Sequence, residues 1–286
     1  MQGEELNLDV VMSHSPLAFP GQSRLTRDYL SDIMSEARGL DNLPAITVSV
    51  MDSKNILFQE MQGVRVTGKQ TVATLDDYFH IGSCSKSVLA LIAENLVEQK
   101  KISWNTRFFD LFPELADDAN ELYHDISLED LFLCKAGIKA YTNRKTEKFP
   151  EFDPSVRNPR LEFIKQLISQ PPASKNKHGK FRQLYSNASY TMASAMLETV
   201  TGRSYEDLVT KTLTDDLNMK VHIGWPNSFG ADQPWGHHIS NDKIEALPPG
   251  HEYRLPCLIA PAGDLSLTPR DYAIYTQLHL RGLRGE

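Results

Sequence analysis

The feature that most constrains the fold is a long apolar helix that opens with small polar residues and a lysine. In YFHIGSCSKSVLALIAENLVEQKK, residues 78–101, the run Ser83-Cys84-Ser85-Lys86 comes just before an apolar stretch that is typical of a fully buried helix. A lysine at the edge of a core carries a desolvation cost, so a compensating group is expected. The lysine is then a surface accident, part of a structural ion pair, or the base of a nucleophile.

The bulk composition is that of a soluble globular protein and excludes several function classes. The 286 residues allow one large domain or two ordinary ones, at roughly 150 residues per domain. A net charge of −7 argues against a nucleic-acid surface, and no apolar run approaches the ~20 residues of a membrane span. The three cysteines have no C-x-x-C spacing, so neither a zinc site nor a disulfide scaffold is expected. The first residues show no signal peptide.

Local patterns predict a mixed order of elements. Residues 25–40 have the apolar spacing of a helix, and residues 44–66 hold two β-rich runs that flank a turn at 52–55. Further helices are expected over 126–138, closed by Gly137, over 186–202 and 204–219, and from Thr268 onward. Residues 141–160, charged and proline-containing, are expected to form an irregular surface excursion.

The pattern S-x-x-K is weak by itself, and the chain contains three matches. Two of them, at 174/177 and at 240/243, lie in polar stretches without an apolar helix behind them. Only Ser83 and Lys86 lead into a long apolar helix. The sequence context therefore favours this pair.

Physical chemistry gives the Ser83 and Lys86 pair a catalytic interpretation. A serine at the first turn of a helix faces unpaired backbone N–H groups, which stabilise developing negative charge. Lys86, three residues on, lies on the same helix face and within reach of the Ser83 hydroxyl. Burial lowers the pKa of a lysine, so Lys86 could accept the serine proton. The structural alternative is an N-cap at Ser83 with Lys86 reaching solvent.

A second segment offers a proton relay and an amide. Tyr185-Ser186-Asn187 precedes another apolar helix, and a phenol close to a lysine cation can act as a base or relay. An asparagine side chain offers both a donor and an acceptor to an amide-containing substrate. Tyr141-Thr142-Asn143 also fits Y-x-N but lies in the charged excursion. The structural alternative is an aromatic residue at a helix entry with Asn187 as its cap.

In combination and in this order, these motifs resemble the serine β-lactamase and penicillin-binding-protein superfamily. S-x-x-K is one of its signatures; no S-D-N occurs here, so the tyrosine-containing branch fits better. That branch contains class C β-lactamases, D-alanyl-D-alanine peptidases and related esterases. Sequence similarity to this branch extends to the segments PAITVSVMDSKNILFQEMQG, RFFDLFPEL, ISLEDLFLCKAGI, VTGRSYEDL, TDDLNM and PAGDLSLTPRDYA. The resemblance therefore covers nearly all of the chain from Leu43 onward.

The resemblance implies an α/β (α+β) fold, in which an antiparallel sheet is flanked by helices and carries an inserted all-helical subdomain. We expect residues 1–100 to form the N-terminal part of the α/β domain, including the Ser83 helix. Residues 101–250 would then be the helical subdomain, and residues 251–286 the return to the α/β domain.

The resemblance also implies residue roles. Ser83 would be the acylating nucleophile, Lys86 its proton acceptor, Tyr185 the shared base or relay, and Asn187 a substrate anchor. The expected activity is that of a serine hydrolase acting through an acyl-enzyme on a β-lactam, a D-amino-acid peptide or a carboxylic ester. The resemblance implies no cofactor or metal, and the expected partner is a small-molecule or peptide substrate. The sequence does not indicate an oligomeric state. The family mostly works in the periplasm, on the cell envelope or outside the cell.

Two departures from the family pattern stand out. Relatives often have His-Thr-Ser-Gly where this chain has residues 134–137, Cys-Lys-Ala-Gly, which we expect to affect packing near the site. After Asn187 the sequence has no Lys-Thr-Gly or His-Thr-Gly triplet, and strands are scarce in the same region. We therefore expect a C-terminally truncated hydrolase. The alternatives are a penicillin-binding or sensor-type protein without turnover, and a short paralogue that has lost catalysis.

Overall fold

The computed structural model describes residues 26–40, 42–143, 147–174, 181–240 and 243–286. Two predictions fall partly outside the described residues: the start of the helix expected over 25–40, at Leu25, and the S-x-x-K match that ends at Lys177. The chain forms two compact units: unit 1 holds Met1–His80, Trp225–Tyr253 and Ser266–Glu286, and unit 2 holds Ile81–Gly224 and Arg254–Leu265. The domain boundaries expected from the sequence stay a prediction.

Unit 1 contains most of the strands. Its elements in chain order are α1 (Arg27–Leu40), β1 (Ala45–Met51), β2 (Ile56–Gly63), β3 (Phe79–His80), a 3₁₀ turn η6 (Pro226–Ser228), β5 (Gly236–Ser240), β6 (Lys243–Leu247), β7 (Leu265–Leu267, which starts one residue before the unit) and α8 (Pro269–Arg284).

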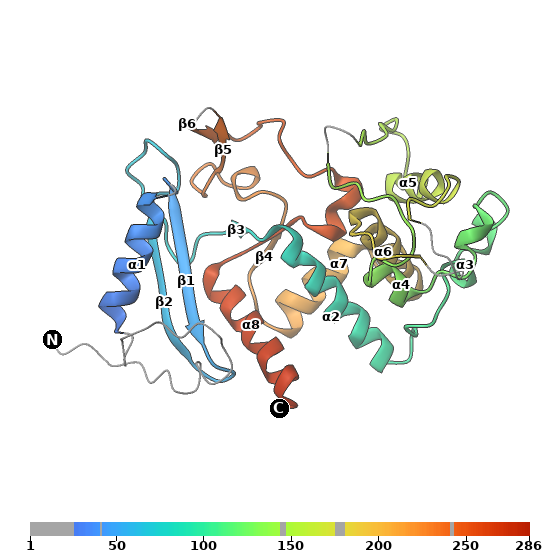
Figure 1. Cartoon of the computed structure of the whole chain (residues 1–286), viewed down its shortest axis with the longest axis horizontal. Helices are drawn as coiled ribbons and strands as arrows, with labels where there is room; N and C mark the ends of the chain where they lie inside the picture. Colours follow the sequence, from blue (N-terminus) through green and yellow to red (C-terminus); the bar gives the residue numbers. More distant parts are fainter. Residues whose placement is uncertain (1–25, 41, 144–146, 175–180, 241–242) are drawn as a thin grey trace. The chain divides into compact units, whose positions relative to one another are not determined.

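The predicted N-terminal helix and hairpin are confirmed. Strands β1 and β2 pair antiparallel from Ala45 opposite Gly63 to Met51 opposite Ile56, and both α1 and α8 pack against β1 (Figure 1). Gly63 has a φ of 108°, and a Cβ there would lie 2.1 Å from the Pro44 carbonyl oxygen, so only glycine fits. The pairs β3–β7 and β5–β6 are also antiparallel.

Unit 2 contains most of the helices. Its elements are η2 (Gly82–Cys84), α2 (Ser85–Glu98), α3 (Phe108–Leu111), η3 (Pro113–Leu115), η4 (Glu121–Tyr123), α4 (Leu128–Phe132), α5 (Pro159–Ile168), α6 (Asn187–Thr201), α7 (Tyr205–Val209), a π-helix η5 (Thr210–Asp216), β4 (Val221–Ile223) and η7 (Cys257–Ala262).

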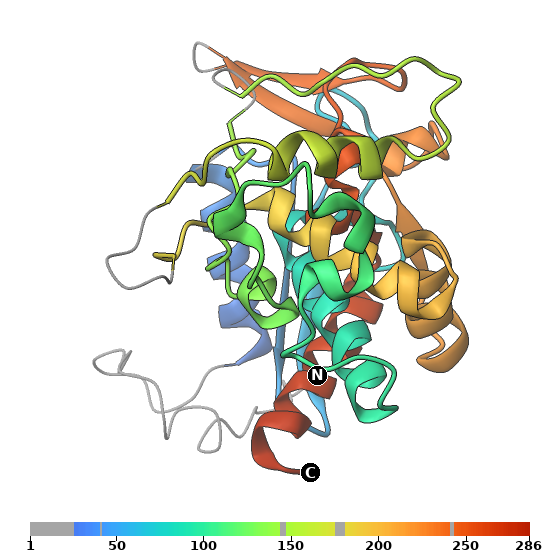
Figure 2. The ribbon, with the colours of Figure 1, turned by 90° about the vertical axis from the view of Figure 1, so that its right-hand side faces the viewer.

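Helix α6 is the centre of unit 2. Every residue from Ala188 to Leu197 is buried, which matches its continuous run of small and apolar side chains. The helix packs against α2, α3, α4, α5, α7 and η7 (Figures 1 and 2). Helix α2 is likewise buried along Val88, Leu89, Ile92 and Ala93, as its sequence predicts. The first turns of α2 and α6 carry Lys86 and Asn187, respectively.

The predicted helix starts and stops are largely confirmed. The Ser204 and Thr268 hydroxyls accept hydrogen bonds from the backbone N–H groups three residues on, so both residues are N-caps. Gly202 ends α6 in the left-handed region, with a φ of 65°. No helix in the described ranges is long and apolar enough to cross a membrane.

Three sequence expectations were wrong in detail. The helix expected over 126–138 ends at Phe132, because Cys134 takes a φ of 55° and turns the chain. The helix expected over 204–219 changes at Thr210 into the π-helix η5. The excursion after residue 140 is not simply a surface loop, since Tyr141 is only 7% exposed and packs against Phe163.

Candidate active site

A tight turn before α2 presents Ser83. Gly82, Ser83 and Cys84 form one 3₁₀ turn, and the φ of 53° at Gly82 favours glycine. The buried Ser85 hydroxyl fixes this turn by donating to the Gly82 carbonyl oxygen at 2.7 Å and accepting from the Leu265 N–H at 3.2 Å. The Ser83 side chain is exposed on the turn, whereas Lys86, three residues later, is 7% exposed.

Lys86 reaches Ser83 and two stronger acceptors. Its Nζ lies 3.3 Å from the Ser83 Oγ, 2.8 Å from the Asn187 Oδ1 and 2.7 Å from the Ala262 carbonyl oxygen. A neutral amine has two N–H donors and one lone pair. If the N–H groups serve Asn187 and Ala262, the lone pair is left for the Ser83 hydroxyl.

The surroundings of Lys86 favour that neutral form. Burial lowers its pKa, and this effect outweighs the opposing contribution of the Tyr185 hydroxyl. Among the residues that the structure describes, no carboxylate forms an ion pair with Lys86. The predicted lowering of the lysine pKa is therefore confirmed in direction and in cause.

Two tyrosines flank the amine. The ring centre of Tyr185 lies 4.7 Å from the Lys86 Nζ and its hydroxyl interacts with the amine, while half of its side chain is exposed. Tyr190, which the sequence analysis missed, has its ring centre 5.1 Å from the same atom. The Tyr190 hydroxyl donates to the Phe132 carbonyl oxygen, and burial raises its pKa to about 12. The Tyr190 hydroxyl thus stays protonated, and its ring packs against the Lys86 amine. Tyr185, by contrast, is half exposed to solvent.

Asn187 links Lys86 to the loop around Tyr141. Its Oδ1 accepts from Lys86, and its Nδ2 donates to the Tyr141 carbonyl oxygen at 2.9 Å. The N-cap of α6 is Ser186, whose hydroxyl accepts from the Ser189 N–H, and not Asn187. Each end of the Asn187 amide keeps one further hydrogen-bonding position, so its substrate contact stays a prediction.

The segment that carries Tyr185 is tied to the loop 134–141 by backbone contacts. The Leu184 N–H donates to the Cys134 carbonyl oxygen, the Asn187 N–H to the Ala140 carbonyl oxygen, and the Ser186 hydroxyl to the Lys139 carbonyl oxygen, at 2.8 to 2.9 Å. The Ser186 N–H donates to the Cys134 Sγ at 3.4 Å. The Cys-Lys-Ala-Gly departure therefore lies next to the site.

A single carboxylate holds the turn that follows. Glu147 accepts from the backbone N–H groups of Tyr141, Thr142 and Asn143 at 2.9, 2.7 and 3.0 Å. Burial raises the pKa of Glu147, but these N–H contacts outweigh burial and hold the pKa below its ordinary value. The Y-x-N match at Tyr141, set aside in the sequence, thus supports the site through its backbone. A lone glutamate in a charged stretch gives no sequence signal for this role.

Of the other two S-x-x-K matches, one is fully described and belongs to a different unit from Ser83. Ser240 and Lys243 pair across the end of the β5–β6 hairpin in unit 1. Lys177 lies outside the described residues. Ser83, Lys86, Tyr185 and Asn187 all belong to unit 2, and the structure brings these four together.

Solved structures with the same fold are numerous. A class C beta-lactamase superposes with a TM-score of 0.68 at 19% identity, over 87% of this chain and 63% of that one. FmtA from Staphylococcus aureus gives 0.66 at 20% identity, over 87% and 65%, respectively. An octameric penicillin-binding protein homologue from Pyrococcus abyssi gives 0.67 at 19% identity, over 88% and 56%. At these identities the likeness shows the fold alone.

Sequence comparison agrees with the fold. An unguisins hydrolase of Aspergillus violaceofuscus is 24% identical over 227 residues, which cover 76% of this chain and 38% of that protein. The chain thus spans less than two thirds of the length of these relatives. The family profile Beta-lactamase matches residues 30–286, nearly the whole chain. The chain therefore belongs to the beta-lactamase family, a family of serine hydrolases that share this mixed α/β fold.

Proposed function

We propose that the chain is a serine acyl hydrolase that forms an acyl-enzyme at Ser83. The observation that carries the proposal is the environment of the Lys86 amine. The amine donates hydrogen bonds to the Asn187 Oδ1 and to the Ala262 carbonyl oxygen. Its third polar neighbour is the hydroxyl of the exposed Ser83, at 3.3 Å. Lowered basicity by burial and a free lone pair are the two properties that a base for serine needs at neutral pH.

In the proposed reaction Lys86 takes the Ser83 proton as the Oγ attacks the acyl carbon. The Ser83 backbone N–H stabilises the oxyanion of the tetrahedral intermediate. The carbon–heteroatom bond then breaks, and the leaving group receives a proton that Lys86 passes on, directly or through the Tyr185 hydroxyl. Attack by water on the Ser83 ester releases a carboxylic acid and regenerates the serine. This sequence fits a β-lactam, a D-amino-acid peptide or a carboxylic ester, because each offers an acyl carbonyl.

A second candidate is a protein that becomes acylated and stays so. An acyl-enzyme that forms and persists, as in a penicillin-binding or sensor protein, uses the same Ser83 and Lys86.

An intact-mass time course separates these functions. The chain is mixed with a penicillin, an activated ester or a D-alanyl-D-alanine peptide, beside a Ser83→Ala variant and a Ser87→Ala control on the next turn. The hydrolase predicts an adduct that needs Ser83, is kept in Ser87→Ala, and decays as acid product accumulates. A stable adduct indicates the sensor function. Absence of any adduct on the folded protein with all three reagents contradicts both.

A further inference from the structure

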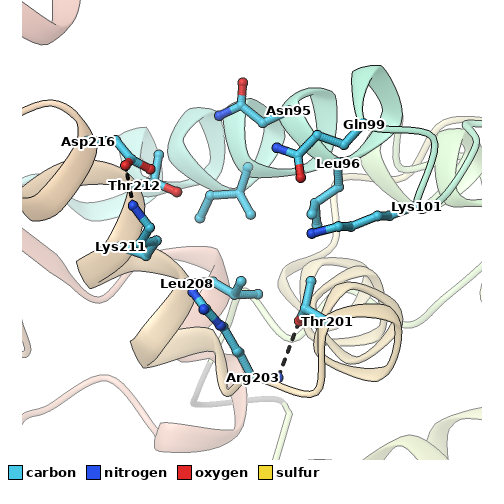
Figure 3. Close-up of a pocket in the computed structure, with 11 residues that line it drawn as sticks. Asn95, Leu96, Gln99, Lys101, Thr201, Arg203, Leu208, Lys211, Thr212 and Asp216 are labelled. Carbon is cyan, nitrogen blue, oxygen red and sulfur yellow. Dashed lines mark hydrogen bonds and ion pairs between the residues drawn. The ribbon is translucent and has the colours of Figure 1, made fainter.

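A second recess in unit 2 is independent of the Ser83 site. A hollow of about 330 Å³ lies between the C-terminal half of α2, the end of α6, α7 and the π-helix η5 (Figure 3). Its volume is at the lower end of the range for small-molecule sites. Its lining residues are Ile92, Asn95, Leu96, Gln99, Lys101, Thr201, Arg203, Leu208, Lys211, Thr212 and Asp216, none of which belongs to the Ser83 site.

The charges around the hollow are unequal. Three cations line it, Lys101, Arg203 and Lys211, against one carboxylate, Asp216, which pairs with Lys211. Across the described ranges, neither Lys101 nor the Arg203 guanidinium forms an ion pair. The residues that line this hollow thus carry an excess of two positive charges, while Asp207 and Asp215 line the neighbouring hollow with Arg203 and Lys211.

The cations lie on different sides of the hollow. In Figure 3, Lys101 and Lys211 stand at opposite sides, and the Arg203 side chain runs beneath Leu208 toward the Lys211 side. Leu96 and Leu208 also line the hollow, and each leaves a small apolar surface exposed there, at 6% and 5% of the residue. Gln99, the C-cap residue of α2, also extends toward the hollow. A compact anion would meet one side only, whereas a ligand with two anionic ends and an apolar middle would meet both.

The π-helix shapes the Lys211 side. Its i→i+5 spacing brings Lys211 next to Asp216, five residues later, and π-helical turns occur frequently at functional sites. A neighbouring hollow of about 290 Å³ shares Arg203 and Lys211 but adds the carboxylates of Asp207 and Asp215. These carboxylates disfavour larger polyanions that would extend past Arg203, so the ligand is expected to be small.

We infer that this hollow binds a small organic dicarboxylate. Arg203, whose planar guanidinium suits bidentate contact, would hold one carboxylate with Lys211 beside it. Lys101 and the Gln99 amide would hold the other carboxylate, and the aliphatic middle would cover Leu96 and Leu208. The inference does not depend on any reaction at Ser83.

Calorimetric titration of the whole chain with glutarate tests the inference. Butyrate, a monoanion, and sulfate, a compact dianion, are titrated at the same ionic strength. We expect saturable glutarate binding that is at least about 10-fold tighter than binding of either control, since a charge-assisted contact is lost with each. Lack of saturable glutarate binding, or sulfate binding of equal strength, would overturn the inference.

Variants locate the binding. Lys101→Gln and Arg203→Gln should each weaken glutarate binding by about 10-fold or more. Lys165→Gln is the matched control, because Lys165 is exposed on α5 and pairs with Glu162. If all three variants bound glutarate as tightly as the unmodified chain, the ligand would bind elsewhere, and the inference would be contradicted.

A measurement on the unmodified chain guards against variants that fail to fold. The side-chain amide signals of Gln99 in a ¹⁵N spectrum should shift and saturate with glutarate but not with butyrate. If those signals do not move while glutarate binds, the hollow is not its site.

Discussion

Two lysines near helix α2, one at its N-terminal end and one in the hollow along its C-terminal half, differ in burial. At the N-terminal end Lys86 is 7% exposed and donates to Asn187 and Ala262, and burial lowers its pKa. In the hollow along the C-terminal half of α2, the Lys211 side chain is 44% exposed and pairs with Asp216, whose side chain is 53% exposed. Burial makes Lys86 a candidate proton acceptor, whereas Lys211 is partly exposed to solvent and forms an ion pair. Burial thus decides what each cation can do and how much its loss should cost.

The largest expected effect is the loss of the buried amine. Lys86→Met keeps the length and most of the packing but removes the proton acceptor, so acylation of Ser83 should fall by about 10²- to 10⁴-fold. The rate is measured by intact mass with an activated ester. Lys165→Met, on the exposed face of α5, should acylate at the wild-type rate. A Lys86→Met variant that acylates like wild type would remove the distinction between the two lysines near α2.

Removal of the Asn187 amide should have the next largest effect. Asn187→Leu leaves the Tyr141 carbonyl oxygen without its donor and Lys86 without one acceptor. We expect the free energy of unfolding to fall by about 1–3 kcal/mol, since an unsatisfied polar group costs that much. Urea denaturation measures this change, with Gln99→Leu at the other end of α2 as the control. If the two variants lost the same free energy of unfolding, the claim that burial sets the cost of losing a polar side chain would be contradicted.

Glu147 should give a smaller, pH-dependent effect. Its folded pKa lies below its unfolded value, so its contribution to stability is present above the unfolded pKa and is lost as pH falls through the folded pKa. Glu147→Gln should lower the free energy of unfolding at pH 7 by roughly 1 kcal/mol, after allowance for solvent screening. Wild type and variant should converge in acid denaturation curves. A constant difference at all pH values would contradict the assignment.

The smallest effect is expected at the exposed ion pair of the hollow. Asp216→Asn breaks the contact with Lys211, but exposed pairs of this kind contribute only about 0–1 kcal/mol. The melting temperature should therefore change little, and the change should vanish at high salt. A large fall in melting temperature that does not depend on salt would mean that the ion pair is shielded from solvent, as Lys86 is, and would contradict the comparison.

The sequence predicts the local half of the candidate site well. The i,i+3 spacing of Ser83 and Lys86 and the apolar character of α2 follow from residues close in the chain, as do the caps at Ser204 and Thr268. Tyr185 and Asn187 could be placed only with the help of the family resemblance. Their approach to Lys86 joins residues about a hundred positions apart.

The contacts that the sequence could not predict are made by backbone groups. The Ala262 carbonyl oxygen lies 176 residues after Lys86, and nothing about an alanine signals that its carbonyl oxygen will be an acceptor. The Tyr141 carbonyl oxygen was missed for the same reason, because the charge of its neighbours indicates a solvent-exposed loop. The π-helix also left no pattern, since the apolar spacing of 204–219 fits an ordinary α-helix.

The central claim, that a buried neutral lysine activates Ser83, is tested most directly by the pH dependence of acylation. The rate of adduct formation is measured across the alkaline range, and peptide mapping locates the adduct. Because burial lowers the Lys86 pKa, the neutral fraction should grow with pH, and the rate should rise to a plateau below the ordinary lysine range. Lys86→Met should abolish this rising limb. A limb that persists in Lys86→Met, or an adduct on a residue other than Ser83, would contradict the account.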